Sequence, residues 1–298
     1  YIIMGFKEVY KHKTSISKTA IFFLIIFVSV VLHTILAYFL TGFFEAERGL
    51  FVQHYDLNSQ SSVNRLKLIQ LISSIGLFIT PTLLYSYLTG FGFKFGLLRR
   101  QSVFLVLAIM MLITPFIALL LEWNMQISFP KWVAHFDQNS EAIIEAFLKM
   151  NNLLDLFYTL IVLAVIPAIG EELLFRGYLQ QHINSWLKNH HLAILITAIL
   201  FSVIHLDAQG IIPRFVLGVL LGYFFYWSQS IWLPIIAHFA NNAQAVIFSH
   251  PAIKPEDSVS FLNEGQTSPI LALFSFASVL LLLYILHQYL SIKKDSIK

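Results

Sequence analysis

Long, uninterrupted runs of apolar residues dominate the chain. A helix needs about 20 apolar residues to cross a hydrocarbon core of about 30 Å. Four runs meet this length without difficulty: Thr19–Phe44, Leu66–Thr89, Ser102–Trp123 and Leu271–Ile292. A fifth, Leu153–Ile183, is long enough but contains a charged cluster, and three shorter runs follow it, at Leu192–Leu206, Ile211–Trp227 and Ile231–Phe248. Because the runs are continuous and do not alternate, they predict helices and not a β-barrel.

We therefore expect an all-α polytopic membrane protein with about eight transmembrane helices; seven or nine remain alternatives, because the three short runs are the weakest candidates. The composition supports this class. Of the 298 residues, 57% are hydrophobic and only 12% are charged, about half the charged fraction usual in soluble proteins. The net charge of +3, without a basic aromatic-rich tract, argues against a nucleic-acid partner. The absence of cysteine excludes disulfides, thiolate metal sites and a cysteine nucleophile.

The distribution of charge predicts the topology. With eight spans both termini lie on one side, and that side carries 12 of the 19 Lys and Arg residues but only 4 of the 16 Asp and Glu residues. The positive-inside rule then places both termini in the cytoplasm, with the chain in the cell membrane. The first run is too long for a signal-peptide core and no cleavage site follows it, so we expect a retained helix.

The chain is expected to form a single membrane domain over residues 1–298. Residues 1–150 supply N-terminal helices and an amphipathic segment, residues 151–250 the catalytic core, and residues 251–298 a polar loop and the last helix. In the amphipathic segment, between the third and fourth spans, apolar Ile143, Ile144, Phe147 and Leu148 share one helical face, and Glu141, Glu145 and Lys149 share the other. This pattern predicts a helix on the membrane surface, either a simple connector or a lid that guides substrate.

The charged cluster in the fifth run is Glu171, Glu172 and Arg176. Ionisable groups inside a membrane are costly and indicate function by default. Glu172 and Arg176 are four residues apart and can form an ion pair on one helix face, which is a structural role. Glu171 points about 100° away, so it is not paired by the same arginine and is a candidate general base.

Two hairpins bring further polar groups toward Glu171. The midpoint between Glu171 and His205 is residue 188, inside a polar turn, so the two side chains are expected at equal depth near mid-membrane. In the next hairpin, His238 and Asn242 share a helix face. Each of these residues could instead be a polar packing contact between helices. Together, a carboxylate, two imidazoles and an amide are the groups that amide hydrolysis requires.

The motifs Glu-Glu-x-x-x-Arg (Glu171 to Arg176), Phe-x-x-x-His (Phe201, His205) and His-x-x-x-Asn (His238, Asn242) resemble those of the CPBP family. These are the CAAX protease and bacteriocin-processing proteins, also called Abi or Rce1-like intramembrane glutamic proteases. The resemblance spans Glu171 to Asn242. It implies an eight-helix bundle with a water-filled cavity that opens toward the cytoplasm and the lipid.

The resemblance also implies roles for the residues. Glu171 would activate water with the help of His205, and His238 and Asn242 would form an oxyanion hole. Glu172, Arg176 and Phe201 would be supporting residues. No cofactor is expected, although a zinc ion held by Glu171, His205 and His238 is an alternative.

Three functions compete at this stage. The leading one is an intramembrane endopeptidase that cuts a membrane-associated protein or peptide. The second is a non-catalytic CPBP-type scaffold or immunity protein that binds a membrane partner. The third, an ion-coupled transporter, lacks the repeated halves and paired broken helices that such proteins show. The sequence does not identify the substrate.

Overall fold

The computed structural model describes residues 6–41, 56–253 and 267–295. Nearly all of these residues are helical, and within them no β-strand is formed beyond one isolated bridge between Phe95 and Ser230. The helices are α1 (Ser15–Leu40), α3 (Gln60–Ser74), η2 (Ile75–Ile79), α4 (Thr80–Thr89), α5 (Arg100–Leu112), α6 (Thr114–Met125), α7 (Lys131–Leu148), α8 (Leu153–Leu160), η3 (Ile161–Val165), α9 (Ile166–Glu172), η4 (Leu173–Leu179), α10 (Gln180–Leu187), α11 (His190–Val203), α12 (Ile211–Ser228), α13 (Trp232–Phe248) and α14 (Pro269–Asp295).

The predicted all-α membrane fold is confirmed, and every predicted apolar run forms a helix. Within the described residues, five continuous helices are long and apolar enough to cross a membrane: 15–40, 60–89, 153–187, 211–228 and 269–291. The pair α5 and α6 makes a sixth, bent by 42° where Pro115 removes a backbone donor. The end of the first predicted run, at Phe44, and most of the loop Ser249–Ser268 lie outside the described residues.

Two predicted spans are shorter than a membrane requires. Helix α13 has 17 residues and α11 has 14, which gives α11 a length of about 21 Å against a core of about 30 Å. Helix α11 ends at Val203, so His205 lies in the connection after the helix, whereas the sequence predicted it inside the span. The connection between α11 and α12 therefore lies partly inside the helical bundle.

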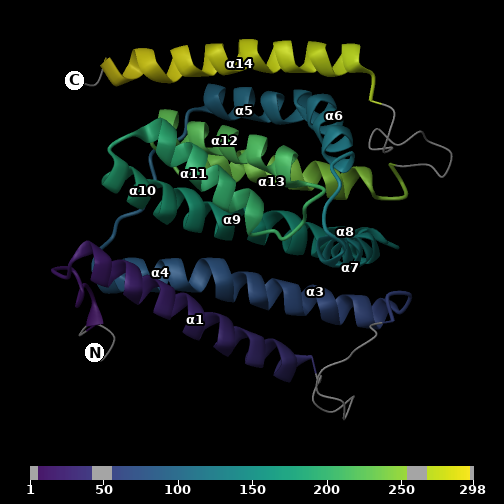
Figure 1. Ribbon diagram of the computed structural model, residues 1–298, viewed down its shortest axis with the longest axis horizontal. Coiled ribbons are helices and arrows are strands. Elements are labelled where there is room, and N and C mark those ends of the chain that lie inside the picture. Colours follow the sequence, from purple (N-terminus) through teal and green to yellow (C-terminus); the bar gives the residue numbers. More distant parts are fainter. Residues whose placement is uncertain (1–5, 42–55, 254–266, 296–298) are drawn as a thin grey trace.

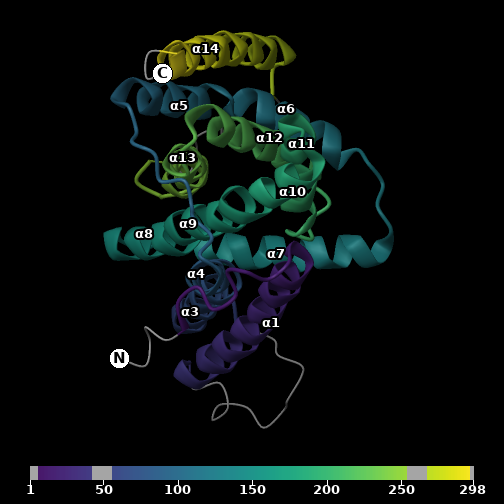
Figure 2. The same cartoon turned by 90° about the vertical axis from the view of Figure 1, so that its left-hand side faces the viewer.

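The long helices run side by side in layers along one axis of the molecule (Figure 1). Helices α1, α3 and α4 form one outer layer, α8 to α13 the middle, and α5, α6 and α14 the other outer layer. The described ends of the chain, at the start of α1 and the end of α14, lie at the same end of the bundle. The turned view shows α7 crossing the bundle at a steep angle (Figure 2). We call the end of the bundle with α7 the α7 end, and the other the terminal end.

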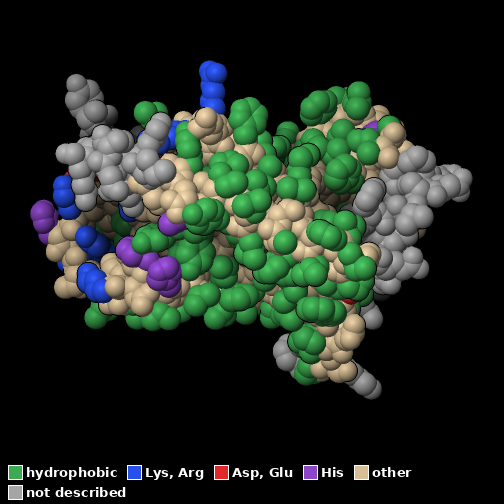
Figure 3. All heavy atoms as spheres, turned by 90° about the horizontal axis from the view of Figure 1, so that it is seen from above, with side chains coloured by type: hydrophobic (Ala, Val, Ile, Leu, Met, Phe, Trp, Pro, Cys, Tyr) green, Lys and Arg blue, Asp and Glu red, His purple; other side chains and the backbone are tan. Residues whose placement is uncertain are grey.

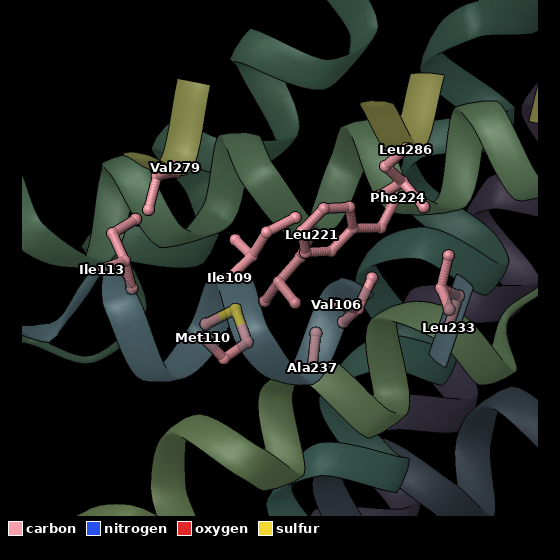
Figure 4. Close-up of a cluster of buried hydrophobic side chains, with 10 residues drawn as sticks. All are labelled: Val106, Ile109, Met110, Ile113, Leu221, Phe224, Leu233, Ala237, Val279 and Leu286. Carbon is pink, nitrogen blue, oxygen red and sulfur yellow. The ribbon is translucent and has the colours of Figure 1, made fainter. Parts of the chain in front are cut away.

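Interior packing joins α5, α12, α13 and α14. Figure 4 shows the largest cluster of buried side chains, which consists of Val106, Ile109, Met110, Ile113, Leu221, Phe224, Leu233, Ala237, Val279 and Leu286. This cluster fixes α12 and α13, which carry part of the polar site, against an outer layer.

The exterior is also apolar. On α1, Leu24 and Phe27 are at least 60% exposed, as are Leu273, Phe274 and Leu281 on α14. Seen from the side of α14, hydrophobic side chains cover the middle of the molecule, whereas Lys, Arg and His side chains gather at the terminal end (Figure 3). Such an apolar belt is the surface that faces lipid in a multi-pass membrane protein.

Candidate active site

A cavity of about 340 Å³ lies between α9, α11, α12, α13 and α7. All four predicted catalytic residues line it: Glu171, His205, His238 and Asn242. The rest of the lining is mostly apolar and comprises Met110, Ile144, Leu148, Leu163, Phe201, Arg214, Leu217, Leu221, Asn241, Ala245 and Val246. The three sequence motifs thus meet around one mainly apolar pocket with a few convergent polar groups, the usual character of a ligand site.

Glu171 is presented by the continuous helical segment 153–187. This segment contains two π-helical stretches, η3 before Glu171 and η4 immediately after Glu172. Such irregular turns often occur at functional sites. The neighbouring Gly170 allows α9 to approach η2, because an added Cβ would lie only 2.8 Å from the Cβ of Phe78. The close fit fixes the position of α9, and with it the carboxylate of Glu171, which is only 7% exposed.

The carboxylate of Glu171 lies between the two imidazoles. Its Oε2 atom is 3.7 Å from Nε2 of His205 and 3.9 Å from Nε2 of His238. The same oxygen accepts no hydrogen bond from the protein. The predicted meeting of Glu171 and His205 across the hairpin is therefore present, and the hairpin turns at Lys188, in left-handed conformation, as the midpoint argument predicts.

The other nitrogen of each imidazole is held by an acceptor. Nδ1 of His205 lies 2.7 Å from the carbonyl oxygen of Phe201, and Nδ1 of His238 lies 2.9 Å from Oε1 of Glu172. A carbonyl or an ionised carboxylate can only accept, so both Nδ1 atoms carry the proton. In the neutral state both Nε2 atoms therefore present lone pairs to Glu171, and they become donors only as imidazolium.

Glu172 and Arg176 form the expected ion pair. Nη1 of Arg176 lies 2.7 Å from Oε1 of Glu172, and both side chains are completely buried. Nη2 of Arg176 donates to the carbonyl oxygen of Gly218, 2.9 Å away. The guanidinium also lies 4.7 Å from the centre of the Phe201 ring, a cation–π distance. The pair thus ties the helix of Glu171 to α11 and α12.

The sequence did not predict that Glu172 has a second partner. Its Oε1 atom contacts both Arg176 and His238, so Glu172 orients one of the two imidazoles at the pocket. Only the atomic positions decide which of the twin acids the imidazole contacts.

Asn242 is held from both ends of its amide. Its Nδ2 donates to the carbonyl oxygen of Leu163 in η3, 3.0 Å away, and its Oδ1 accepts from Nδ2 of Asn241 at 3.2 Å. An amide nitrogen has two hydrogens, so one remains to donate into the pocket. Asn241, which also lines the pocket, was not singled out in the sequence.

Two further polar residues at the site were missed. Arg214, in the first turn of α12, lines the pocket and forms a 2.5 Å ion pair with Asp207 in the α11–α12 connection. The amide of Asn124 holds this connection in place by donating to the carbonyl oxygen of Ala208 at 2.7 Å and accepting from the backbone N–H of Ile212 at 2.9 Å. The short loop that carries His205 is therefore fixed from both sides.

The zinc ion that the sequence offers as an alternative at Glu171, His205 and His238 stays a prediction. Zinc requires ligand atoms about 2.0–2.2 Å from the metal, in tetrahedral array. Glu171, His205 and His238 offer suitable atoms, but among the described residues no group of three or more His, Cys, Asp or Glu side chains has a geometry that could hold a metal ion.

The pocket lies toward the α7 end of the bundle. Its lining includes Ile144 and Leu148 of α7, Arg214 at the start of α12, and Ala245 and Val246 near the end of α13, and all these segments belong to that end (Figure 1). Two expectations from the sequence therefore disagree, because cytoplasmic termini and a cavity that opens toward the cytoplasm require the pocket to face the terminal end.

The fold and the pocket together define a helical, multi-pass membrane protein with a buried carboxylate facing two imidazoles. Residues 153–244 match the family model described as type II CAAX prenyl endopeptidase Rce1-like. The predicted resemblance to the CPBP, Rce1-like family is confirmed for this segment, which holds all three motifs; the matched family is one of CAAX-type endopeptidases. Comparison with curated proteins and with solved structures finds no match.

Proposed function

We propose that the chain is an intramembrane endopeptidase that hydrolyses a peptide bond of a membrane-associated protein or peptide with water activated by Glu171. The observation that carries the proposal is the position of Glu171 Oε2 at 3.7 and 3.9 Å from the Nε2 atoms of two imidazoles, inside one pocket. These separations exceed direct hydrogen-bond lengths and suit a water molecule bridging the three groups.

In the first step, Glu171 takes a proton from water while the water oxygen attacks the carbonyl carbon of the substrate. His205, whose Nε2 faces the same carboxylate, accepts a second hydrogen bond from the water and orients it. The result is a tetrahedral intermediate with one negative oxygen. A positioned general base of this kind contributes on the order of 100- to 10,000-fold to the rate.

The intermediate is stabilised by donors that point into the pocket. Asn242 supplies its remaining amide hydrogen. His238 supplies Nε2–H as imidazolium, and the charge of that imidazolium is balanced by Glu172 at its Nδ1. This is the role of a carboxylate that orients and stabilises a catalytic histidine. The C–N bond then breaks, and the proton held by Glu171 passes to the leaving amine.

Charge balance supports a protonated imidazole. The buried set contains two carboxylates, Glu171 and Glu172, and one guanidinium, Arg176. A net negative charge in an apolar surrounding is costly, and one imidazolium offsets it. We assign no separate function to Glu172 in the chemistry itself, because it contacts His238 and Arg176 and does not line the pocket.

The test is to compare the membrane proteomes of cells with the unmodified protein and with the Glu171→Gln variant. A peptide bond cut only in the first is the expected result. The matched control is Glu145→Gln, the same change at an exposed carboxylate on α7, which should leave cleavage intact. If Glu171→Gln retains cleavage, Glu171 is not the base. If a cellular phenotype of the protein survives Glu171→Gln without any cleavage, the scaffold hypothesis replaces the peptidase.

A further inference from the structure

The two ends of the bundle differ in charge. At the terminal end lie the segment before α1, the α4–α5 connection and the α10–α11 turn, which are joined by contacts such as Trp186 Nε1 to Ser15 Oγ at 3.1 Å. Their basic residues are Lys7, Lys11, Lys13, Lys18, Lys94, Arg99, Arg100 and Lys188, and Glu8 is the single acid described there before α14. Figure 3 shows the same gathering of cationic side chains.

The α7 end carries mainly acids. Backbone and side-chain contacts join its segments: Asn151 Nδ2 of the α7–α8 connection donates to Gln60 Oε1 at the start of α3, and Thr267 N donates to Glu122 Oε1 at the end of α6. Its acids whose side chains are described are Asp56, Glu122, Glu141, Glu145, Asp155 and Asp207, against the basic residues Arg65, Lys67, Lys149 and Arg214.

Basic loops of membrane proteins stay in the cytoplasm, whereas acidic residues have little influence on orientation. The terminal end therefore faces the cytoplasm, and the α7 end faces away from it. The pocket with Glu171 lies toward the α7 end, because its lining comes from α7, from the start of α12 and from the end of α13. Helix α11 ends at Val203 toward the same end, and the connection after it carries His205 of the pocket.

We propose that the pocket takes its substrate from the non-cytoplasmic face of the membrane, so that the substrates are membrane-attached polypeptides exposed on that face. This inference rests on the proposed peptidase function, because only a peptidase has a polypeptide substrate. The orientation of the pocket in the membrane does not depend on that function. Substrates that stay in the cytoplasm, such as proteins anchored by lipid to the inner leaflet, are then outside its reach.

The chain is suited to a direct test because it contains no cysteine. Three single variants place a cysteine at exposed positions outside the proposed catalytic groups: Ser128→Cys in the α6–α7 connection, Ala245→Cys in the lining of the pocket, and Ser185→Cys in α10 at the terminal end. Ser128 and Ser185 form a matched pair, since the same nearly isosteric change is made at each end. Intact cells are treated with a membrane-impermeant maleimide, and a second sample is treated after permeabilisation.

We expect Ser128→Cys and Ala245→Cys to be labelled in intact cells, and Ser185→Cys to be labelled only after permeabilisation. Labelling of Ser185→Cys alone in intact cells would reverse the orientation and overturn the proposal. If Ala245→Cys and Ser185→Cys show the same labelling pattern, the pocket opens to the terminal end, and the proposal is also overturned. So would labelling of Ser128→Cys without Ala245→Cys.

The same labelling in a Glu171→Gln background separates the two proposals. Accessibility does not depend on catalysis, so the pattern should be unchanged when Glu171 is replaced. The expected labelling pattern without any cleaved substrate would contradict the peptidase proposal and support the orientation. Cleavage of a cytoplasmic peptide bond by the unmodified protein would support the peptidase and contradict the orientation.

Discussion

The ion pair between Glu172 and Arg176 should be the most sensitive polar contact in the protein. Arg176→Met removes a cation that is completely buried, bonded to Glu172 at 2.7 Å and to the Gly218 carbonyl at 2.9 Å. Methionine has similar length and fits the space against Phe201. The change leaves Glu172 as an uncompensated charge, and breaking one partner of a buried pair costs about 3–5 kcal/mol. Titration of the protein in mixed micelles with a denaturing detergent unfolds it, and the shift of the unfolding midpoint measures this loss of stability.

The surface pair of Lys11 and Glu8 is the matched control, because its N–O distance is also 2.7 Å while both side chains are substantially exposed. Exposed pairs often contribute nothing measurable to stability, so Lys11→Met should leave the unfolding midpoint unchanged. The double variant Glu172→Gln/Arg176→Met removes both charges and should recover most of the loss. If Arg176→Met is as harmless as Lys11→Met, then Glu172 is not held in a dry interior, and the charge-balance argument for the site fails.

Three other changes test the packing and the chemistry. Gly170→Ala places a Cβ 2.8 Å from Phe78 and should reduce cleavage by displacing α9; Phe78→Ala in the same chain should restore part of the activity. Asn242→Ala should lower the cleavage rate on the order of 100- to 1,000-fold by removing an oxyanion donor, whereas Asn241→Ala should keep most of it. Lys67→Met replaces a buried cation that donates to Thr159 and has no carboxylate partner among the described residues; thermal unfolding should show equal or higher stability, and a large loss would contradict that expectation.

Much of the site could be predicted because helical hairpins have simple geometry. Two antiparallel helices joined by a tight turn bring residues equidistant from the turn to equal depth, and Lys188 supplies that turn in left-handed conformation. The second turn, at Gln229, behaves in the same way. Spacing along the chain was therefore enough to bring Glu171 and His205 together, whereas it did not fix the position of His238 relative to them. The apolar runs likewise predicted the helices, since hydrocarbon leaves the backbone few alternatives.

Other features depend on contacts that spacing does not encode. Where α11 ends is decided by the loop after it, which Asn124 holds from a helix about 80 residues earlier in the chain. Whether His238 contacts Glu171 or Glu172 is decided by helix rotation within a few tens of degrees, and the π-helical stretch η4 changes that rotation directly after the twin acids. The position of the pocket toward the α7 end depends on the same two features, so the sequence did not reveal that cytoplasmic termini and a cytoplasmic cavity exclude one another.

The orientation of the two imidazoles explains why a carboxylate without its own hydrogen bond is retained between them. Each Nδ1 proton is committed to an acceptor, the Phe201 carbonyl in one case and Glu172 in the other. With His238 as imidazolium, two acceptors remain, Oε2 of Glu171 and Nε2 of His205, and they lie 3.7 Å apart. Two facing acceptors are stable only when they share a proton or bind a molecule with hydrogens to donate, and a water molecule has two hydrogens, one for each. The geometry that favours a bound water in the resting site thus also aligns that water for deprotonation. The contacts of the two Nδ1 atoms keep the imidazole rings in this orientation.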